Sequence, residues 1–287
     1  MRSALAWSLL FGSAAAAANV AGGLAVVARR EWNERFLKYF LGLGAGFMLA
    51  ATFLRMLPES MRLTDRAPLL FLGGYFLVHF FEHTVAPHFH FGEERHDEVM
   101  MNPAVGISAL AGLTIHTFFD GVSIASGFLV SVPLGLLIFC AVILHKIPEG
   151  VTVASIALAS GHGKRGALAA SFILAAATLA GFLATATFAF LKRRVRRPRP
   201  CDLAPHPVFR VRAPDRFSFP SGHTINAFAI GGVLAWEWPV LAPALGLLAG
   251  GIGASRVILG LHYASDVAAG AILGVTIAGA VCVLLLR

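Results

Sequence analysis

Long apolar stretches recur along this chain, separated by short polar or basic segments. Most of them reach roughly twenty residues, the length that an α-helix needs to cross the hydrocarbon core of a bilayer. The pattern predicts an all-α fold, a polytopic helical bundle of the membrane. We expect about nine membrane helices, at residues 4–28, 37–57, 66–86, 103–129, 131–158, 166–191, 222–238, 240–259 and 265–286.

Composition supports this class of protein. The chain is 57% hydrophobic and only 13% charged, whereas soluble globular domains carry about 25% charged residues. The opening segment also resembles a signal peptide, because Arg2 precedes an apolar run and an alanine tract at 14–18. The many spans that follow favour a first membrane helix instead. Three cysteines lie far apart without metal or redox spacing, so they predict no disulfide framework.

Net charge is +8, which in a soluble protein would suggest a nucleic-acid partner. Here the basic residues cluster in loops, as at Arg29-Arg30 and Lys164-Arg165, where they orient the chain in the membrane. We therefore expect no nucleic-acid binding. With the loop 29–38 in the cytoplasm, alternation places residues 192–219 on the extracytoplasmic side of the cell (inner) membrane. The basic stretch 192–200 then breaks the positive-inside rule, and an anionic ligand would explain it.

Three short motifs near the C-terminus supply cations, histidines and a carboxylate. Alternation of the helices brings all three to one extracytoplasmic membrane surface. Any one motif is weak evidence, because a lone histidine at a helix end is often a cap. Together, in order, they predict a phosphate site: Lys192-x6-Arg199-Pro200, Pro220-Ser221-Gly222-His223 and Ser255-Arg256-x5-His262-x3-Asp266.

Each motif has a role in cleaving a phosphate ester. A helix that begins at Ser221 offers backbone N–H groups and a hydroxyl to an anion. Lys192, Arg199 and Arg256 can neutralise the phosphate oxygens in the transition state. No cofactor is needed for this chemistry.

Two histidines and a carboxylate complete the predicted reaction. His262 and Asp266 are four residues apart, so the carboxylate can hold the imidazole in its nucleophilic tautomer. His223 would then protonate the leaving alkoxide and later activate water.

Residues about 165–287 resemble the type-2 phosphatidic acid phosphatase family, which shares its site with the vanadium haloperoxidases. The stretch 217–224, Phe-Ser-Phe-Pro-Ser-Gly-His-Thr, is typical of the lipid-phosphate phosphatases. The resemblance implies that His262 is the nucleophile, His223 the general acid and Asp266 its orienter. It also implies phosphate binding by Lys192, Arg199, Ser221, Gly222 and Arg256. Membrane members of the family usually have six helices, and their first two must here be supplied by something else.

A second constellation lies in the first half of the chain. His116 and Asp120 are one helical turn apart, as are His145 and Glu149. Nitrogen and carboxylate ligands suit Zn²⁺, Fe²⁺ or Mn²⁺, and ionisable groups in a membrane helix are functional candidates. Pro148 frees backbone carbonyls beside them. A structural His–Asp pair that holds two helices together is the alternative.

Residues 1–190 resemble the ZIP (Zrt/Irt-like) metal transporters. The resemblance rests on Leu57-Pro58-Glu59 closing the second helix, His116-Thr-Phe-Phe-Asp-Gly121 and His145-Lys-Ile-Pro-Glu-Gly150. A loop with His83, His88, His90 and His96 captures cytosolic metal or is a solvated linker.

The chain departs from the ZIP pattern at two points. Thr117 and Lys146 stand where many relatives build a second metal position, and a lysine ammonium repels a cation, so at most one metal site is expected. Such transporters also have eight helices, of which the last two are missing here.

The sequence thus predicts a fusion: residues 1–164 as ZIP-like helices one to five and 165–287 as the phosphatase-like domain, sharing helix 166–191. The expected function is hydrolysis of a lipid-linked phosphate monoester or pyrophosphate through a phosphohistidine. The attached region would bind or transport zinc or another divalent metal ion, or serve as a scaffold or regulator. The alternatives are a divalent metal transporter whose phosphatase part is secondary, a haloperoxidase, and a mis-assembled gene. Expected partners are a lipid phosphate, a metal ion and membrane lipid, and the pattern allows a homodimer.

Overall fold

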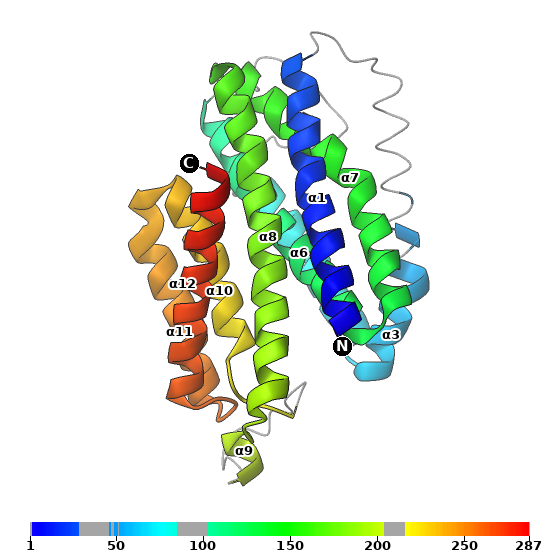
Figure 1. Cartoon of the computed structure of the whole chain (residues 1–287), viewed down its shortest axis with the longest axis vertical. Coiled ribbons are helices and arrows are strands. Elements are labelled where there is room, and N and C mark those ends of the chain that lie inside the picture. Colours follow the sequence, from blue (N-terminus) through cyan, green and yellow to red (C-terminus); the bar gives the residue numbers. More distant parts are fainter. Residues whose placement is uncertain are drawn as a thin grey trace. The chain divides into compact units, whose positions relative to one another are not determined.

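The computed structural model describes residues 2–28, 46, 49–50, 52–84, 103–203 and 216–286. Within these ranges all regular structure is helical, which confirms the all-α class. The elements are α1 (Arg2–Ala28), η1 (Thr52–Met56), α3 (Leu57–Leu63), α4 (Ala67–Thr84), α6 (Pro103–Val130), α7 (Val132–Ala159), α8 (Gly163–Val195), α9 (Pro200–Leu203), α10 (Gly222–Glu237), η2 (Pro239–Leu241), α11 (Ala242–Ile258) and α12 (Ala264–Leu286) (Figure 1).

The predicted helices coincide with observed ones to within about one turn, apart from 37–57. That helix falls mainly outside the described residues, and its described end is the π-helical turn η1. The Leu57-Pro58-Glu59 tripeptide was expected to close this helix. It instead begins α3, so helical structure runs on to Leu63.

Six helical stretches in the described ranges are long and apolar enough to cross a membrane. This supports a multi-pass membrane protein. The helix α4 has a shorter apolar stretch, Ala67–Phe76, and α10 has only 16 residues. The count of nine spans therefore stays a prediction. The six are Leu9–Ala28, Ala109–Val130, Val132–Leu158, Gly163–Leu203, Pro239–Ile258 and Ala264–Leu286.

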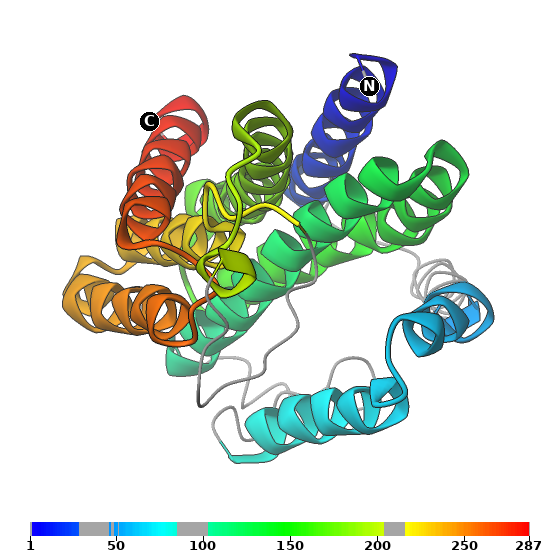
Figure 2. The same ribbon diagram turned by 90° about the horizontal axis from the view of Figure 1, so that it is seen from below.

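The chain divides into two compact units. The first comprises Met1–Ala16, Thr114–Leu136 and Ile173–Arg287, and the second comprises Ala17–Leu113 and Leu137–Phe172. All three phosphate motifs belong to the first unit. In that unit α10, α11 and α12 lie side by side (Figures 1 and 2).

The core of the first unit joins helices from both halves of the sequence. Its buried side chains come from α6, α8, α10 and α12, and most of them are small. Phe118 of α6 is the one aromatic side chain among the fully buried members, and the three from α8 are all alanines. The members are Phe118, Ala177, Ala180, Ala184, Ile225, Ala229, Val233, Ala278 and Cys282. The helix α8 thus packs against α6 and against the helices that carry the phosphate motifs.

Glycines bring these helix backbones close together. A Cβ added at Gly181 of α8 would meet the carbonyl oxygen of Phe118, and one at Gly121 of α6 would meet that of Thr178. On α12, a Cβ at Gly274 would lie 2.6 Å from the carbonyl oxygen of Ile225 in α10. Small residues at such spacing let helices pack closely where lipid supplies no hydrophobic driving force.

The second unit is built in the same way. A Cβ at Gly22 of α1 would meet the carbonyl oxygen of Ile147 in α7, and one at Gly150 would meet that of Asn19. A Cβ at Gly23 would collide with the Ser171 hydroxyl of α8. Backbone contact therefore holds α1 against the segment of α7 that carries His145 and Glu149.

Gly274→Ala tests the α10–α12 contact. The added methyl group would collide with the backbone of α10, so the two helices must move apart. We therefore expect the free energy of unfolding to fall by about 1–3 kcal/mol. Gly279→Ala is the matched control on the same helix, because nothing lies within 4 Å of its added Cβ. Thermal unfolding in detergent should show a lower midpoint for the first variant only. Equal midpoints for the two variants would contradict the close packing.

Candidate active site

Backbone hydrogen bonds tie the three phosphate motifs together. The Ser218 N–H donates to the Arg197 carbonyl at 2.9 Å, which joins the segment before α10 to the basic loop after α8. The Ser221 N–H donates to the Asp266 carbonyl at 3.1 Å, which joins the start of α10 to the first turn of α12. The motifs therefore meet at one end of the unit, as the alternation of helices predicts.

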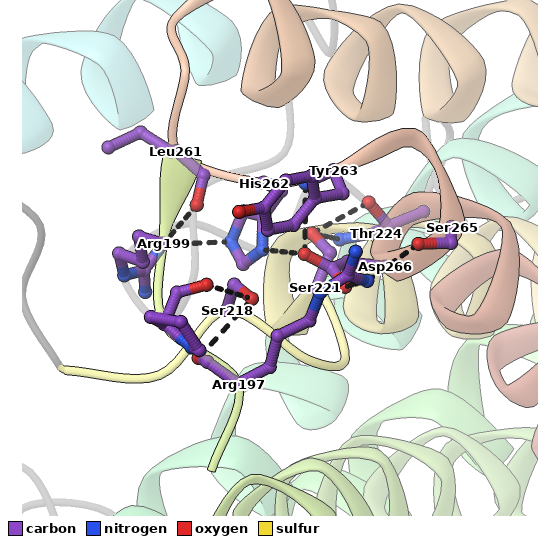
Figure 3. A network of polar contacts seen from close by, with 11 residues as sticks. Arg197, Arg199, Ser218, Ser221, Thr224, Leu261, His262, Tyr263, Ser265 and Asp266 are labelled. Atoms are coloured by element: carbon purple, nitrogen blue, oxygen red, sulfur yellow. Dashed lines mark hydrogen bonds and ion pairs between the residues drawn. The ribbon is translucent and has the colours of Figure 1, made fainter. Parts of the chain in front are cut away.

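Arg199 and Lys192 bring positive charge to this end. Arg199 is 2% exposed, and its Nη1 donates to the Leu261 carbonyl at 2.7 Å. The same nitrogen lies 3.3 Å from His262 Nε2 (Figure 3). Lys192 is buried in the last turn of α8, with Nζ 5.6 Å from the centroid of the Phe188 ring.

The two ring nitrogens of His262 face opposite charges. Nδ1 lies 3.7 Å from Asp266 Oδ2, whereas Nε2 faces Arg199. His262 is 3% exposed, and its Nδ1 has no hydrogen-bond partner among the described residues. Asp266 is on the Nδ1 side, so Nε2 is the nitrogen on the side of the cations, where a phosphate would bind.

The surroundings of His262 keep its imidazole neutral. Burial lowers its pKa from the ordinary value of 6.5 to about 4, and the charges of Arg199 and Lys192 act in the same direction. The Asp266 carboxylate acts the opposite way, as does a backbone hydrogen bond involving Ser218. A neutral imidazole has a lone pair, which is what nucleophilic attack requires.

Asp266 is fully buried and is contacted through both carboxylate oxygens. Oδ2 accepts the Tyr263 N–H at 2.9 Å, and Oδ1 accepts a bond from Arg197 Nη1 at 2.9 Å. Sequence reasoning missed both partners. Arg197 lies inside the six variable positions of the first motif, and no spacing rule distinguishes it from its basic neighbours.

The helix α10 begins where the second motif predicts. Ser221 is its N-cap and has extended backbone dihedrals. The Ser221 hydroxyl oxygen accepts the Thr224 N–H at 3.4 Å and the Thr224 hydroxyl at 2.9 Å. Gly222 and His223 form the first turn, and the His223 side chain is exposed. The backbone N–H groups of this turn lie at the positive end of the helix dipole.

Arg256 lies in the last turn of α11, where its Nε donates to the Ser255 hydroxyl at 3.1 Å. Its carbonyl oxygen accepts the N–H groups of Leu261 at 3.0 Å and His262 at 3.2 Å. The third motif is thus folded back on itself. This turn sets the backbone position of His262.

The predicted metal ligands belong to different units. In the first unit, His116 Nε2 of α6 lies 3.6 Å from Asp120 Oδ2. In the second, His145 Nδ1 of α7 lies 3.0 Å from the Ala141 carbonyl oxygen. A carbonyl only accepts, so Nδ1 carries the proton and Nε2 carries the lone pair, which is the tautomer that binds metals.

Glu149 is paired with a lysine. Its Oε2 lies 2.8 Å from Lys146 Nζ, and Lys146 is fully buried. With its amide oriented to donate, Asn19 bonds to the Lys146 carbonyl at 2.9 Å and to Glu149 Oε2 at 3.3 Å. An internal ammonium therefore already offsets the charge that would attract a metal ion, so the role of Glu149 as a ligand stays a prediction.

Most of the predicted histidine-bearing loop lies outside the described residues. His83 is in the last turn of α4, and His88, His90 and His96 lie outside the described residues. Its role in metal capture stays a prediction.

Two family models match the chain. The PAP2 superfamily model matches residues 166–286, and the ZIP zinc transporter model matches residues 92–190. The chain thus contains a PAP2 superfamily domain and a ZIP zinc transporter domain, which matches the predicted fusion. The two matches overlap in α8, at residues 166–190. The expected ZIP resemblance of residues 1–91 lies outside the match and stays a prediction.

Several curated proteins match part of the chain. The decaprenylphosphoryl-5-phosphoribose phosphatase of Mycolicibacterium smegmatis is 43% identical over 89 residues, 31% of this chain and 47% of that protein. The protein of the same name from Mycobacterium tuberculosis is 40% identical over 103 residues, 33% of this chain and 52% of that protein. The bacitracin transport permease protein BcrC of Bacillus licheniformis is 48% identical over 65 residues, 20% of this chain and 29% of that protein.

The chain thus spans about half the length of the two phosphatases and less than a third of the permease protein. No solved structure gives a significant match.

The pKa of His262 yields the first prediction for the site. In protein with ¹³C-labelled histidine, the His262 resonance should stay at its neutral position from pH 8 to pH 5, because the pKa is about 4. Loss of that resonance in His262→Gln assigns it. A His262 midpoint near 6.5 would contradict the electrostatic arrangement.

Proposed function

We propose that this protein is a membrane phosphatase that hydrolyses a lipid-linked phosphate through a phosphohistidine. The observation that carries the proposal is the setting of His262. It is buried, its Nδ1 faces Asp266 and its Nε2 faces Arg199. A neutral imidazole with a carboxylate on one side and a cation on the other suits attack on a phosphate ester.

The reaction has two steps. His262 Nε2 attacks phosphorus, the bond from phosphorus to the ester oxygen breaks, and His223 gives its proton to the leaving alkoxide. Water then attacks the phosphohistidine and gives a proton to His223. The phosphorus–nitrogen bond breaks, which releases phosphate and restores His262. Asp266 stabilises the positive charge on the imidazole ring of the intermediate.

Positive groups stabilise the phosphoryl group in both steps. In this proposal Lys192, Arg199 and Arg256 hold its oxygens, together with Ser221 and the N–H groups at the start of α10, including that of Gly222. Phosphoryl transfer needs little covalent chemistry from a protein beyond positioning and charge stabilisation. No metal ion is required.

A polyprenyl-linked phosphate is the substrate class that best fits. The site lies where transmembrane helices end, so a phosphate carried on a lipid can reach it while its tail stays in the bilayer. Two of the relatives are named as phosphatases of a decaprenyl-linked phosphoribose, which supports this class. We expect the site to face the extracytoplasmic side, because alternation of the helices from the cytoplasmic loop 29–38 places it there. A phosphate ligand would explain why its basic stretch then breaks the positive-inside rule.

His262→Ala tests the enzyme directly. The full chain in liposomes should release phosphate from a panel of lipid phosphates, and vanadate should inhibit it. Without the nucleophile, turnover should fall by about 10⁴-fold or more. His162→Ala is the control, because His162 is an exposed histidine in the turn before α8 and lies outside the site. Unchanged activity in His262→Ala would refute the proposal.

Divalent-cation binding by the ZIP-like region is a second candidate function. The ZIP family match and the pair formed by His116 and Asp120 favour it. In the second unit, His145 is in the tautomer that suits a ligand. The ion would be cargo rather than a cofactor of the phosphatase. Lys146, paired with Glu149, argues against a second ion.

The combined variant His116→Ala with Asp120→Ala tests cation transport. If the region carries zinc, the wild type should restore growth of zinc-uptake-deficient cells and the variant should not. His162→Ala again serves as the control. Phosphatase activity should persist in the variant, because neither residue is in the phosphate site. Equal rescue by the variant and the wild type would contradict the role of this pair.

A further inference from the structure

Arg197 contacts the phosphate site without being one of the predicted phosphate ligands. Its Nη1 donates to Asp266 Oδ1 at 2.9 Å and to the Ser265 hydroxyl at 2.7 Å (Figure 3). Its guanidinium lies 3.8 Å from the centroid of the Tyr263 ring. Its carbonyl oxygen accepts the Ser218 N–H at 2.9 Å. One residue of the basic loop thus contacts both the start of α12 and the segment before α10.

These contacts fix the plane of the Asp266 carboxylate. Arg197 engages Oδ1, while the Tyr263 N–H engages Oδ2, the oxygen that lies 3.7 Å from His262 Nδ1. Rotation of the carboxylate would break both hydrogen bonds. A fully buried carboxylate also requires compensation of its charge, which the guanidinium supplies.

We propose that Arg197 is a positioning residue, which orients Asp266 and through it the His262 imidazole for phosphoryl transfer. The inference rests on the proposed phosphatase function. Arginine suits the role because its flat guanidinium can stack on Tyr263 while it donates to a carboxylate. Lysine would keep the charge and lose most of the stacking.

The contact between Arg197 and Asp266 also weakens the influence of the Asp266 charge on the pKa of His262. The carboxylate favours the protonated imidazole, and Arg197 offsets part of that negative charge. Arg199 and Lys192 face His262 as well and disfavour its protonation. If Arg197 is replaced by a neutral residue, the Asp266 charge acts more fully and the pKa of His262 rises from about 4 toward its ordinary value.

Arg197→Gln and Arg197→Lys test the proposal in the full chain. For Gln we expect kcat to fall about 10–100-fold, the range typical of groups that orient a reactive residue, with KM little changed. Lysine should restore part of kcat because it keeps a cation beside Asp266. Arg193→Gln is the control, because Arg193 is exposed in the last turn of α8. Both variants remove one positive charge, so both weaken the attraction of the surface for an anionic lipid to a similar extent.

The ¹³C-histidine titration supplies a second measurement. In Arg197→Gln the His262 midpoint should move upward, and in Arg193→Gln it should not. This measurement needs no turnover, so it tests the contact even if the proposed phosphatase activity fails. If Arg197→Gln raises KM and leaves kcat unchanged, Arg197 binds substrate and the proposal is wrong. If kcat and the His262 midpoint both match the wild type, it is also wrong.

Misfolding gives a different result from loss of positioning. A variant that only unfolds the protein lowers the thermal midpoint and leaves less active protein with an unchanged KM and an unchanged His262 titration. Arg197→Lys keeps the cation, so at wild-type thermal stability it still tests the role. A Lys variant that is folded but no more active than the Gln variant would overturn the part of the proposal that assigns charge to Asp266.

Discussion

Close approach between helix backbones is the constraint on which the first unit depends. Lipid provides little drive for helices to associate, so their packing relies on small residues at the contacts. Gly181 lets α8 touch α6 at Phe118, and Gly274 lets α12 touch α10 at Ile225. The close approach of these helices also determines the geometry of the site. The Ser221 N–H can bond to the Asp266 carbonyl only because the first turns of α10 and α12 lie so close.

Charge then organises the space that packing creates. His262 lies between a carboxylate and a guanidinium, and burial strengthens the effect of both. The cations and the loss of water keep its imidazole neutral, while Asp266 faces the nitrogen away from the predicted phosphate. The arrangement is costly, because Arg199 and Asp266 are both nearly inaccessible to water. Such a cost is typical of a site whose groups must be oriented before the reaction starts.

Much of this could be predicted from the sequence, because membrane helices and motif spacing are local signals. Runs of apolar residues predicted the positions of the helices. Alternation of the helices across the membrane predicted that the three motifs meet at one end. The role of Arg197 could not be predicted. Four arginines fall between Lys192 and Pro198, and their order does not say which one faces Asp266. That choice depends on the turn after α8, where Arg196 has a positive φ of 53°.

The pairing of Lys146 with Glu149 could not be predicted from the sequence either. Sequence reasoning treated Lys146 as a group that repels a second cation, whereas in the structure it is itself the cation beside Glu149. Spacing shows that two residues share a helix face and does not show which of them pair. The orientation of Asn19, which depends on the contact between α1 and α7, completes this pair.

The helix α8 belongs to both family matches, so its packing bears on both proposed functions. Its alanines share one buried cluster with side chains of α10 and α12, while Gly181 lies against the α6 backbone. A phosphatase requires α8 to stay fixed, because Lys192 lies in its last turn. Transport by alternating access instead requires groups of helices to move relative to one another. Backbone-to-backbone contact at Gly121 and Gly181 resists sliding between α6 and α8, because packed interfaces shift between discrete arrangements rather than deform continuously. The packing of this helix thus meets the demand of the proposed phosphatase, and α6 supports it within the same unit.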